Sequence, residues 1–296
     1  MRIRLPASAR RSGPLPAAVR RRPPTRRGVR RALPAAVALT LLSPVFACHR
    51  PLVPPGAPTP WPAEYAHRWQ WQWQLDGPVD TDVAADVFLL DPVRTTAEET
   101  TALRRRDRRL VCQVHVGSYA GTDPDATRFP PALRGAPTDR TQRRRWLDVR
   151  RWDVLEPVLA DRFRLCRGKG FGAVALADAD GYAHRSGFPL TFDDQLTFNR
   201  RLAVLARKLD LSPGLMNDVG QVAALAPDFD FAVVEECVRL KVCAKLLPFA
   251  DADKPVFHVE YTGHTATFCV TTLGYGFASI RKNRSLDAWR DPCQLA

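Results

Sequence analysis

The stretch GFGAVALADADGY at residues 170–182 carries the features that decide the fold. Its apolar part, Ala173–Leu176, has the length of a short buried strand, and glycines precede it. Two acidic residues, Asp178 and Asp180, follow directly. Folds built on parallel strands place their functional side chains at the carboxyl ends of those strands, so we expect polar chemistry just after this strand.

A helix is predicted immediately before this strand. Its apolar stripe recurs at helical spacing and consists of Leu155, Val158, Leu159, Phe163 and Cys166. Asp153 is the predicted N-cap of the helix. Gly168 and Gly170 are suitable residues to end it. The segment therefore predicts a helix, a sharp stop and a strand in succession.

Short apolar runs alternate with amphipathic segments in both directions from this point. Further strands are predicted at 69–75, 86–90, 110–116, 211–216, 229–234, 256–260 and 277–280. Thr96 with Glu99, and Thr191 with Asp194, form capping boxes that predict two helix starts. About eight strands with intervening helices fit a β/α barrel, and periodicity alone fits a doubly wound open sheet equally well.

Residues 1–47 form a basic leader followed by an apolar run. They hold eleven arginines and no aspartate, glutamate or lysine, so most of the formal net charge of +13 belongs to the leader. This distribution argues against a nucleic-acid interface. We expect residues 1–47 to be a signal peptide. Residues Val45–Cys48 resemble the bacterial lipobox, in which Cys48 would carry lipid; a plain cleaved signal is the alternative.

Residues 48–66 are expected to be a spacer, because six prolines between positions 49 and 62 favour an extended chain. The folded domain is expected over residues 67–296. We therefore expect an exported protein, either a lipoprotein of the bacterial cell envelope, attached to the membrane through Cys48, or a secreted protein. Apart from Cys48, six cysteines remain, and an even number permits disulfides in an exported chain.

Polar residues at the ends of the predicted strands are the candidate functional residues. They are Asp91, His115, Asp178, Asp180, Asn217, Asp218, Glu235, Glu236, Glu260 and Tyr261. Parallel strands of a barrel deliver such residues to one rim. Several carboxylates at one rim suit acid–base chemistry on a sugar or a metal-dependent hydrolase, whereas strand-end acids also commonly cap the following helices.

Tryptophan and glutamine alternate in the first predicted strand. Trp69, Trp71 and Trp73 share one face of that strand, and the glutamines share the other. A row of indoles stacks on sugar rings in some proteins and more often fills a core.

Several common functional motifs do not occur in the sequence. There is no Gly-x-Gly-x-x-Gly or Walker loop, no Gly-x-Ser-x-Gly elbow and no Cys-x-x-Cys pair. We therefore expect no nucleotide cofactor, no nucleophilic serine and no zinc site.

Nine short motifs, taken in chain order, resemble glycoside hydrolase family 114, the endo-α-1,4-polygalactosaminidase family. They are WQWQL at 71–75, VCQVHVGSY at 111–119, RWLDVR at 145–150, DGY at 180–182, GFPLT at 187–191, ND at 217–218, FDFAV at 229–233, EEC at 235–237 and VEY at 259–261. The resemblance covers nearly the whole expected domain. It implies a (β/α)8 TIM barrel, no cofactor, and an exopolysaccharide of α-1,4-linked galactosamine as substrate.

The resemblance also implies two catalytic carboxylates, of which this chain keeps one. Glu235 matches the second carboxylate. The first is the Asp of a Glu-Pro-Asp-Asn segment, and it falls on Ala177, while the Glu of that segment falls on Ala175. Asp178 is the candidate substitute. It would need a bulge or a bend to serve, because adjacent strand residues face opposite ways.

Other residues take implied roles from the resemblance. Substrate contacts are implied for Asp180, Tyr182, Asn217, Asp218, Glu236, Glu260, Tyr261 and Trp73. Disulfides are implied between Cys237 and Cys243 and between Cys269 and Cys293. Cys112 and Cys166 either pair or stay reduced. Two further departures are Met216, where the family has lysine, and Val234, where it has asparagine.

Three functions remain open from the sequence. The first is a working glycosidase that uses Glu235 with Asp178 or Asp180. The second is a sugar-binding lipoprotein, a pseudoenzyme whose remaining acids attract a cationic amino-sugar polymer. The third is a structural envelope protein whose barrel mouth is filled by Leu176, Met216 and Val234. In each case we expect a monomer.

Overall fold

The structure is a computed structural model that describes residues 69–139 and 143–294. The expected signal peptide at 1–47, Cys48 and the spacer at 48–66 lie outside the described residues. Within them, no helix has both the length and the apolar character that a membrane span requires.

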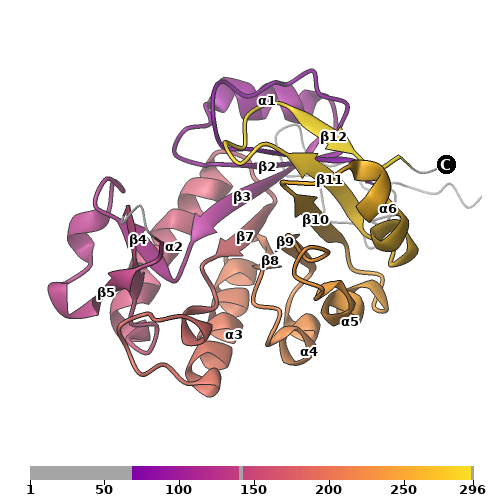
Figure 1. Ribbon diagram of the computed structural model, residues 1–296. Helices are drawn as coiled ribbons and strands as arrows, with labels where there is room; N and C mark the ends of the chain where they lie inside the picture. The colour runs from indigo at the N-terminus through magenta and orange to yellow at the C-terminus, as the bar shows by residue number, and fades with distance from the viewer. Residues whose placement is uncertain (1–68, 140–142, 295–296) are drawn as a thin grey trace, which may run out of the picture. The chain divides into compact units, whose positions relative to one another are not determined.

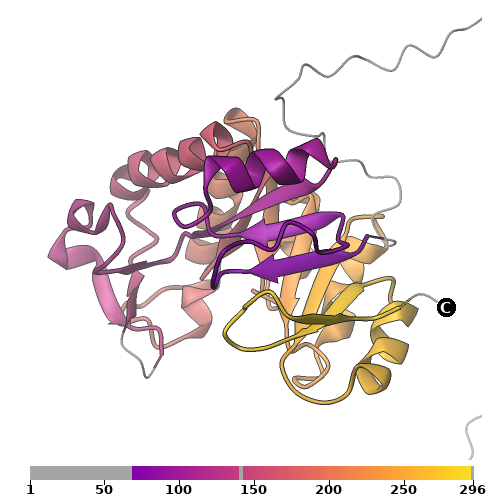
Figure 2. The same cartoon turned by 90° about the horizontal axis from the view of Figure 1, so that it is seen from above.

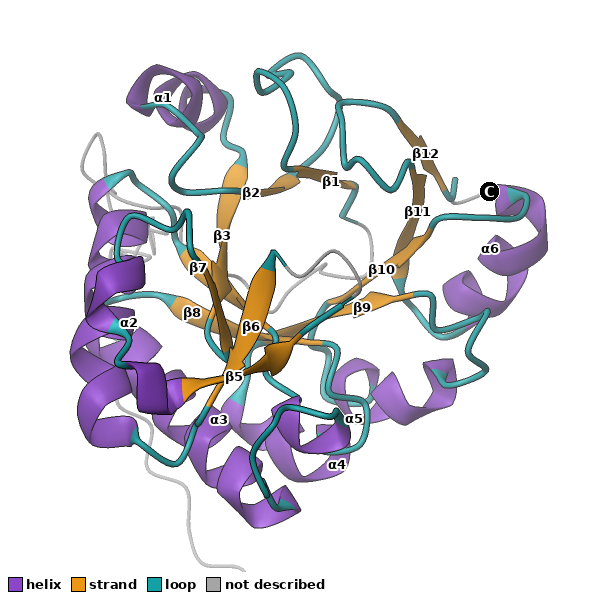
Figure 3. Cartoon of the chain, turned by 60° about the vertical axis from the view of Figure 1, so that its left-hand side comes forward, coloured by secondary structure: helices purple, strands orange, loops and turns teal. Residues whose placement is uncertain are grey.

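Eight parallel strands form a barrel-like ring that matches the eight predicted strands (Figure 3). In order around the ring they are β1 (Trp71–Gln74), β2 (Val87–Leu90), β3 (Arg109–His115), β7 (Ala173–Ala177), β8 (Ser212–Met216), β9 (Phe231–Glu235), β10 (Val256–Glu260) and β11 (Ala278–Lys282). A ninth strand, β12 (Arg290–Pro292), pairs antiparallel with β11. The TIM-barrel prediction is confirmed, and the open-sheet alternative is not needed.

The segment after β11 joins the two ends of the parallel series. Lys282 donates to Gln72 Oε1 at 3.1 Å, and Gln72 Nε2 donates to the carbonyl of Ala288 at 2.7 Å. The backbone N–H of Leu75 donates to the carbonyl of Leu286 at 2.9 Å. Figures 1 and 2 show this C-terminal segment beside the first strands. The buried Gln72 of β1 is therefore satisfied by the segment that closes the ring.

Helices cover the outer face of the ring. They are α1 (Ala97–Arg105), α2 (Trp152–Gly168), α3 (Phe192–Lys208), α4 (Val222–Leu225), α5 (Leu247–Ala250) and α6 (Thr265–Gly274). Short 3-10 turns occur at η2 (Ala126–Arg128), η3 (Pro131–Leu133), η4 (Gly181–Ala183), η5 (Ala226–Asp228) and η6 (Cys243–Leu246). Both predicted capping boxes are present, Thr96 with Glu99 at α1 and Thr191 with Asp194 at α3.

The start of α2 differs from the prediction, whereas its end agrees. Arg151 is the N-cap, and Asp153 lies in the first turn, where its carboxylate pairs with Arg151 at 3.0 Å instead of capping the helix. At the other end, Gly170 adopts a φ of +86°. The N–H of Phe171 donates to the carbonyl of Cys166 at 3.1 Å, which is the glycine stop expected from the sequence.

A small antiparallel sheet, absent from the sequence prediction, separates β3 from α2. Its strands are β4 (Ser118–Ala120), β6 (Arg144–Leu147) and β5 (Arg134–Pro137), in that order. Figure 1 shows this sheet beyond the carboxyl end of β3. It therefore lies on the side of the barrel where functional residues are expected.

The apolar residues divide into a cluster inside the ring and a cluster between ring and helices. Ala175 and Ala177 of β7 belong to the inner cluster with Met216. Leu176 and Val234 belong to the outer one. The side chains at 175 and 177 therefore point into the barrel, whereas Leu176 and Val234 pack against helices and do not fill the mouth.

Three disulfides are present. Cys237–Cys243 and Cys269–Cys293 confirm the two implied by the family resemblance. Cys112 of β3 also pairs with Cys166 of α2, which resolves the question left open by the sequence.

Candidate functional site

The carboxyl ends of the parallel strands bring polar side chains to one rim of the barrel, which we call the mouth. Glu235 is the last residue of β9, and Tyr261 follows β10. His115 ends β3, Asp178 follows β7 and Asn217 follows β8. These five strand ends are contributed by neighbouring members of a single parallel series.

Glu235 is held by hydrogen bonds on both carboxylate oxygens. Asn217 Nδ2 donates to Oε1 at 3.1 Å, and the Tyr261 hydroxyl donates to Oε2. The N–H of Glu235 donates in turn to Asn217 Oδ1 at 3.0 Å. Burial, together with the charge of Glu235, raises the pKa of Tyr261, so this hydroxyl stays a donor. An oriented carboxylate with two fixed donors suits a nucleophile or a general base.

The Tyr261 ring is itself fixed from the far side. The Arg284 guanidinium lies over this ring at 4.6 Å from its centroid. Arg284 also donates to Glu236 at 2.8 Å. The orientation of Glu235 is thus supported by a chain of contacts that passes through Tyr261 to Arg284.

The two positions at which the family resemblance implies acids carry methyl groups. Ala175 is fully buried, and Ala177 is 4% exposed at the mouth end of the inner cluster. Ala177 pairs in register with His115 of the neighbouring strand. The side of the mouth formed by β3 and β7 therefore presents an imidazole next to a methyl group.

The chain bends at Asp178, directly after β7, because this residue adopts a left-handed backbone conformation with a φ of +60°. The carbonyl of Asp178 packs so closely on Gly117 that a Cβ there would lie 1.9 Å from its oxygen. The Asp178 carboxylate lies 2.6 Å from His115 Nδ1 and also accepts from Ser118 Oγ. The bend that Asp178 would need is thus present, and it directs the carboxylate to His115.

Asp178 remains a carboxylate over the physiological pH range. Burial alone would raise the pKa of Asp178, but the charge and hydrogen bond of His115, the Ser118 hydroxyl and the nearby Arg144 outweigh it. The pKa of Asp178 is consequently lowered to about 2. A group with this pKa is a poor proton donor at neutral pH.

A cavity of about 270 Å³ opens beside His115. Its lining combines residues of β3 with residues of the small sheet, the loop after β4 and α2. Among them are Asp91, Gln113, His115, Asp123, Arg144 and Arg162. Arg144 pairs with Asp123 at 3.0 Å, and Arg162 pairs with Asp125 at 2.7 Å. These ion pairs join lining residues from β6 and α2 to lining residues of the loop after β4.

A second acidic group lies near η4 and β8. Asp180 pairs with His184 at 3.0 Å, and Asn199 Nδ2 donates to the buried Asp218 at 3.0 Å. Burial and the charge of Asp180 raise the pKa of Asp218 to about 8. Burial and the charge of Asp218 raise the pKa of Tyr182 to about 12. Asp218 is therefore largely protonated at neutral pH.

Glu236 and Glu260 are engaged with protein partners. Glu236 accepts from Arg239 and Arg284, both at 2.8 Å, and the hydrogen bond from Arg239 is the main cause of its lowered pKa. Glu260 is buried and lies 3.0 Å from His258 Nε2. Both acids thus support neighbouring segments and do not present open carboxylates.

Trp73 lies in the barrel core. It is 2% exposed, and its indole N–H donates to Gln113 Oε1 at 2.9 Å. The ring therefore offers no open face to a sugar, and the row of indoles packs the interior of the barrel.

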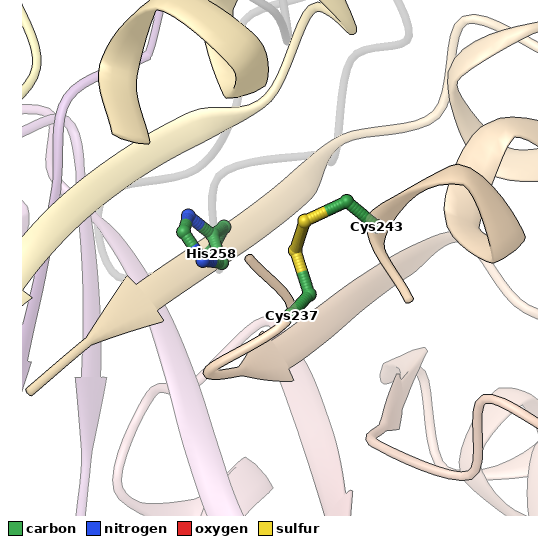
Figure 4. Close-up of side chains that lie close together, drawn as sticks. All are labelled: Cys237, Cys243 and His258. Atoms are coloured by element: carbon green, nitrogen blue, oxygen red, sulfur yellow. A yellow bond between two sulfur atoms is a disulfide. The ribbon is translucent and has the colours of Figure 1, made fainter. Parts of the chain in front are cut away.

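Cys237, Cys243 and His258 lie close together, as Figure 4 shows. The two sulfurs are joined in a disulfide, so neither is a thiolate that could bind a metal ion. His258 Nδ1 lies 3.0 Å from Ser279 Oγ, and its other nitrogen faces Glu260. This group is a buried structural cluster.

Sequence reasoning did not identify the residues of the small sheet and its surroundings. Arg144 donates to Ser118 Oγ at 2.9 Å, and Arg162 donates to the carbonyl of His115 at 2.5 Å. Both contacts join residues distant in sequence, and the first joins two strands, β4 and β6, that no periodicity predicts. No local signal marks these arginines.

A family model for glycoside-hydrolase family GH114 matches residues 52–296. The chain belongs to glycoside hydrolase family 114. The match includes every strand of the barrel and both sides of the mouth described above. Ala175 and Ala177 of β7 lie within the matched range.

Solved structures agree with this assignment. Ega3 of Aspergillus fumigatus, determined in complex with galactosamine, is 27% identical, with a TM-score of 0.71, over 76% of this chain and 95% of that chain. The glycoside hydrolase domain of PelA from Pseudomonas aeruginosa is 12% identical, with a TM-score of 0.60, over 75% and 97%. The second likeness shows the shared fold. No curated protein matches the sequence.

Proposed function

We propose that this family 114 member is an exported glycoside hydrolase that acts on an α-1,4-linked galactosamine polysaccharide, with Glu235 as a catalytic carboxylate. The observation that carries the proposal is the position of Glu235 at the mouth, with one oxygen bound by Asn217 and the other by Tyr261. The similarity to Ega3, whose structure holds galactosamine, supports the choice of sugar.

The charge of the mouth supports a cationic substrate. A galactosamine polymer carries ammonium groups, and Glu235, Asp178 and Asp180 supply carboxylates around the mouth. Opposite charges raise the local concentration of substrate and speed encounter. Asp180, Tyr182 and Asn217 are the residues that we propose to contact the sugar units on the β7–β9 side.

Export is part of the proposal. It is supported by the leader at 1–47, whose arginines and apolar run suit a signal peptide, and by three disulfides, which persist in oxidising compartments. We propose a lipid anchor at Cys48, with the proline-rich segment as a spacer and a monomeric barrel that faces the exopolysaccharide.

The direct test is the release of reducing ends from α-1,4-linked polygalactosamine. We expect the wild-type protein to release them, and Glu235→Gln to lose at least about 10³-fold in rate, because a catalytic carboxylate is removed with its shape retained. Glu156→Gln, on the outer helix α2, is the matched control and should retain the wild-type rate. An inactive wild-type protein, or an active Glu235→Gln, would contradict the proposal.

A second function is favoured by the methyl groups at the mouth. The family resemblance implies acids at positions 175 and 177, where this chain has alanine, so the barrel would bind the polymer without cleaving it. In that case calorimetry would show binding without turnover. Ala177→Asp places an inward-facing acid at the mouth. If the wild type binds the polymer without cleaving it, this variant should gain hydrolysis.

A further inference from the structure

We propose that His115 is the proton donor to the departing glycosidic oxygen, and that Asp178 is the positioning residue that holds its imidazole. This inference rests on the proposed hydrolytic function and assigns the acid that Ala177 no longer supplies. Nothing in the family pattern described above gives position 115 this role.

The first support is the geometry of the pair. Asp178 Oδ2 lies 2.6 Å from His115 Nδ1, so Nδ1 is the nitrogen engaged by the carboxylate. This leaves Nε2 for a second partner. A histidine whose Nδ1 faces a carboxylate is fixed in ring orientation and tautomer, as a proton-transferring imidazole requires.

The second support is access. The His115 side chain is 31% exposed and lines the 270 Å³ cavity beside the mouth. His115 also shares its register position with the inward-facing Ala177, next to the space where the family's acid would project. The ring is thus open to a bound sugar on the side that Asp178 does not occupy.

The third support is that the surroundings hold the pair in place. Ser118 donates to the Asp178 carboxylate, and Arg144 donates to Ser118 Oγ at 2.9 Å. Arg162 fixes the backbone carbonyl of His115 at 2.5 Å. Besides Asp178, which contacts the imidazole, the charged residues that line the cavity with His115 are Asp91, Asp123, Asp125, Arg128, Arg144, Asp161 and Arg162.

The protonation state of Asp178 explains why His115, and not Asp178, is the proton donor. The Asp178 carboxylate stays ionised near neutrality, so it stabilises an imidazolium and does not itself give up a proton. Imidazole is the side chain that exchanges a proton most readily near neutral pH.

In the proposed step, His115 donates a proton while the glycosidic bond breaks. The Nε2 proton passes to the glycosidic oxygen as the C1–O bond breaks, and the electron pair of that bond stays on the oxygen. Glu235 acts on the opposite side of the sugar. The water that is consumed delivers its hydroxyl to C1 and one proton to the enzyme, and proton exchange with solvent returns Glu235 to the carboxylate and His115 to the imidazolium.

The test compares two substrates in the full-length protein. We expect His115→Gln to lose at least about 100-fold in kcat on the polymer. On an α-1,4-galactosamine oligosaccharide with a dinitrophenyl leaving group, which departs without protonation, we expect a loss below about tenfold. A merely structural histidine would lower both rates equally, and that result would overturn the inference.

Asp178→Asn provides a second readout. Loss of the anion destabilises the imidazolium, so the alkaline limb of the pH–rate profile should move to lower pH. Asp210→Asn is the matched control, because Asp210 has a similar left-handed φ of 54° but precedes β8 at the other pole and is exposed. An Asp178→Asn profile that coincides with the wild type would overturn the positioning role.

The outcomes separate this inference from the proposed function. If the wild type cleaves the polymer and His115→Gln cleaves it at the same rate, only the His115 role fails. If the wild type cleaves neither substrate, hydrolysis and the His115 role fail together.

Discussion

The left-handed backbone conformation of one residue, Asp178, determines which groups meet on one side of the mouth. Asp178 is one position beyond Ala177, and its φ of +60° directs the carboxylate to His115. The sequence indicated that Asp178 would need a bend, but aspartate only tolerates this conformation and does not require it. The contact with Gly117, which enforces the bend, joins residues 61 positions apart and has no local signal.

Asp218 gives a residue-scale prediction about stability and pH. Its pKa is raised to about 8 in the folded protein, against an ordinary value near 4. The folded state therefore holds a proton that the unfolded state releases, and stability from this group falls as pH rises from about 4 towards 8. Asp218→Asn should remove that loss.

Denaturant unfolding of wild type and Asp218→Asn at pH 5 and pH 8 measures this effect. We expect the unfolding free energy of Asp218→Asn, relative to the wild type, to be at least about 1 kcal/mol higher at pH 8 than at pH 5. An equal difference at both values would contradict the assignment of a buried, protonated Asp218.

At the scale of elements, local sequence patterns predicted the barrel strands and the helix starts. They did not predict the short strands whose pairing depends on residues distant in sequence. The eight barrel strands and both capping boxes follow from apolar runs and from residues three positions apart. Strands β4, β5, β6 and β12 have only three or four residues each, and their pairing partners are set by tertiary packing. Asp153 was wrongly predicted as the N-cap of α2, because Arg151, two residues earlier, takes that position and pairs with the Asp153 carboxylate.

Lys282 of β11 connects β11 to β1 and to the segment that closes the ring. Lys282 is buried and donates to Gln72 Oε1 and to the carbonyls of Asp287 and Trp289. Lys282→Met keeps the volume but leaves these acceptors without their donor, so we expect a loss of about 2–4 kcal/mol in the unfolding free energy. Lys208→Met, at the exposed end of α3, should change it by less than about 0.5 kcal/mol.

Chemical denaturation of the three proteins provides the measurement. If Lys282→Met were as stable as the wild type, β1 and β11 would not depend on this lysine for their connection.

At the scale of the whole molecule, a basic leader precedes a barrel whose mouth carries Glu235 and Asp178 at the carboxyl ends of β9 and β7. The family assignment and the parallel topology follow from motifs spread along residues 71–261, because their order is preserved even where single residues change. What the motifs do not reveal is the contact of Asp178 with His115 and Ser118, since it depends on how strand ends and the small sheet pack together.

The most direct test of the account is a crystal structure of Glu235→Gln with an α-1,4-galactosamine oligosaccharide. We expect the sugar to span the mouth, with the side chain at 235 on one side of a glycosidic bond and His115 Nε2 within hydrogen-bond distance of its oxygen. An oligosaccharide bound away from the mouth, or at the mouth but out of reach of both residues, would contradict the account.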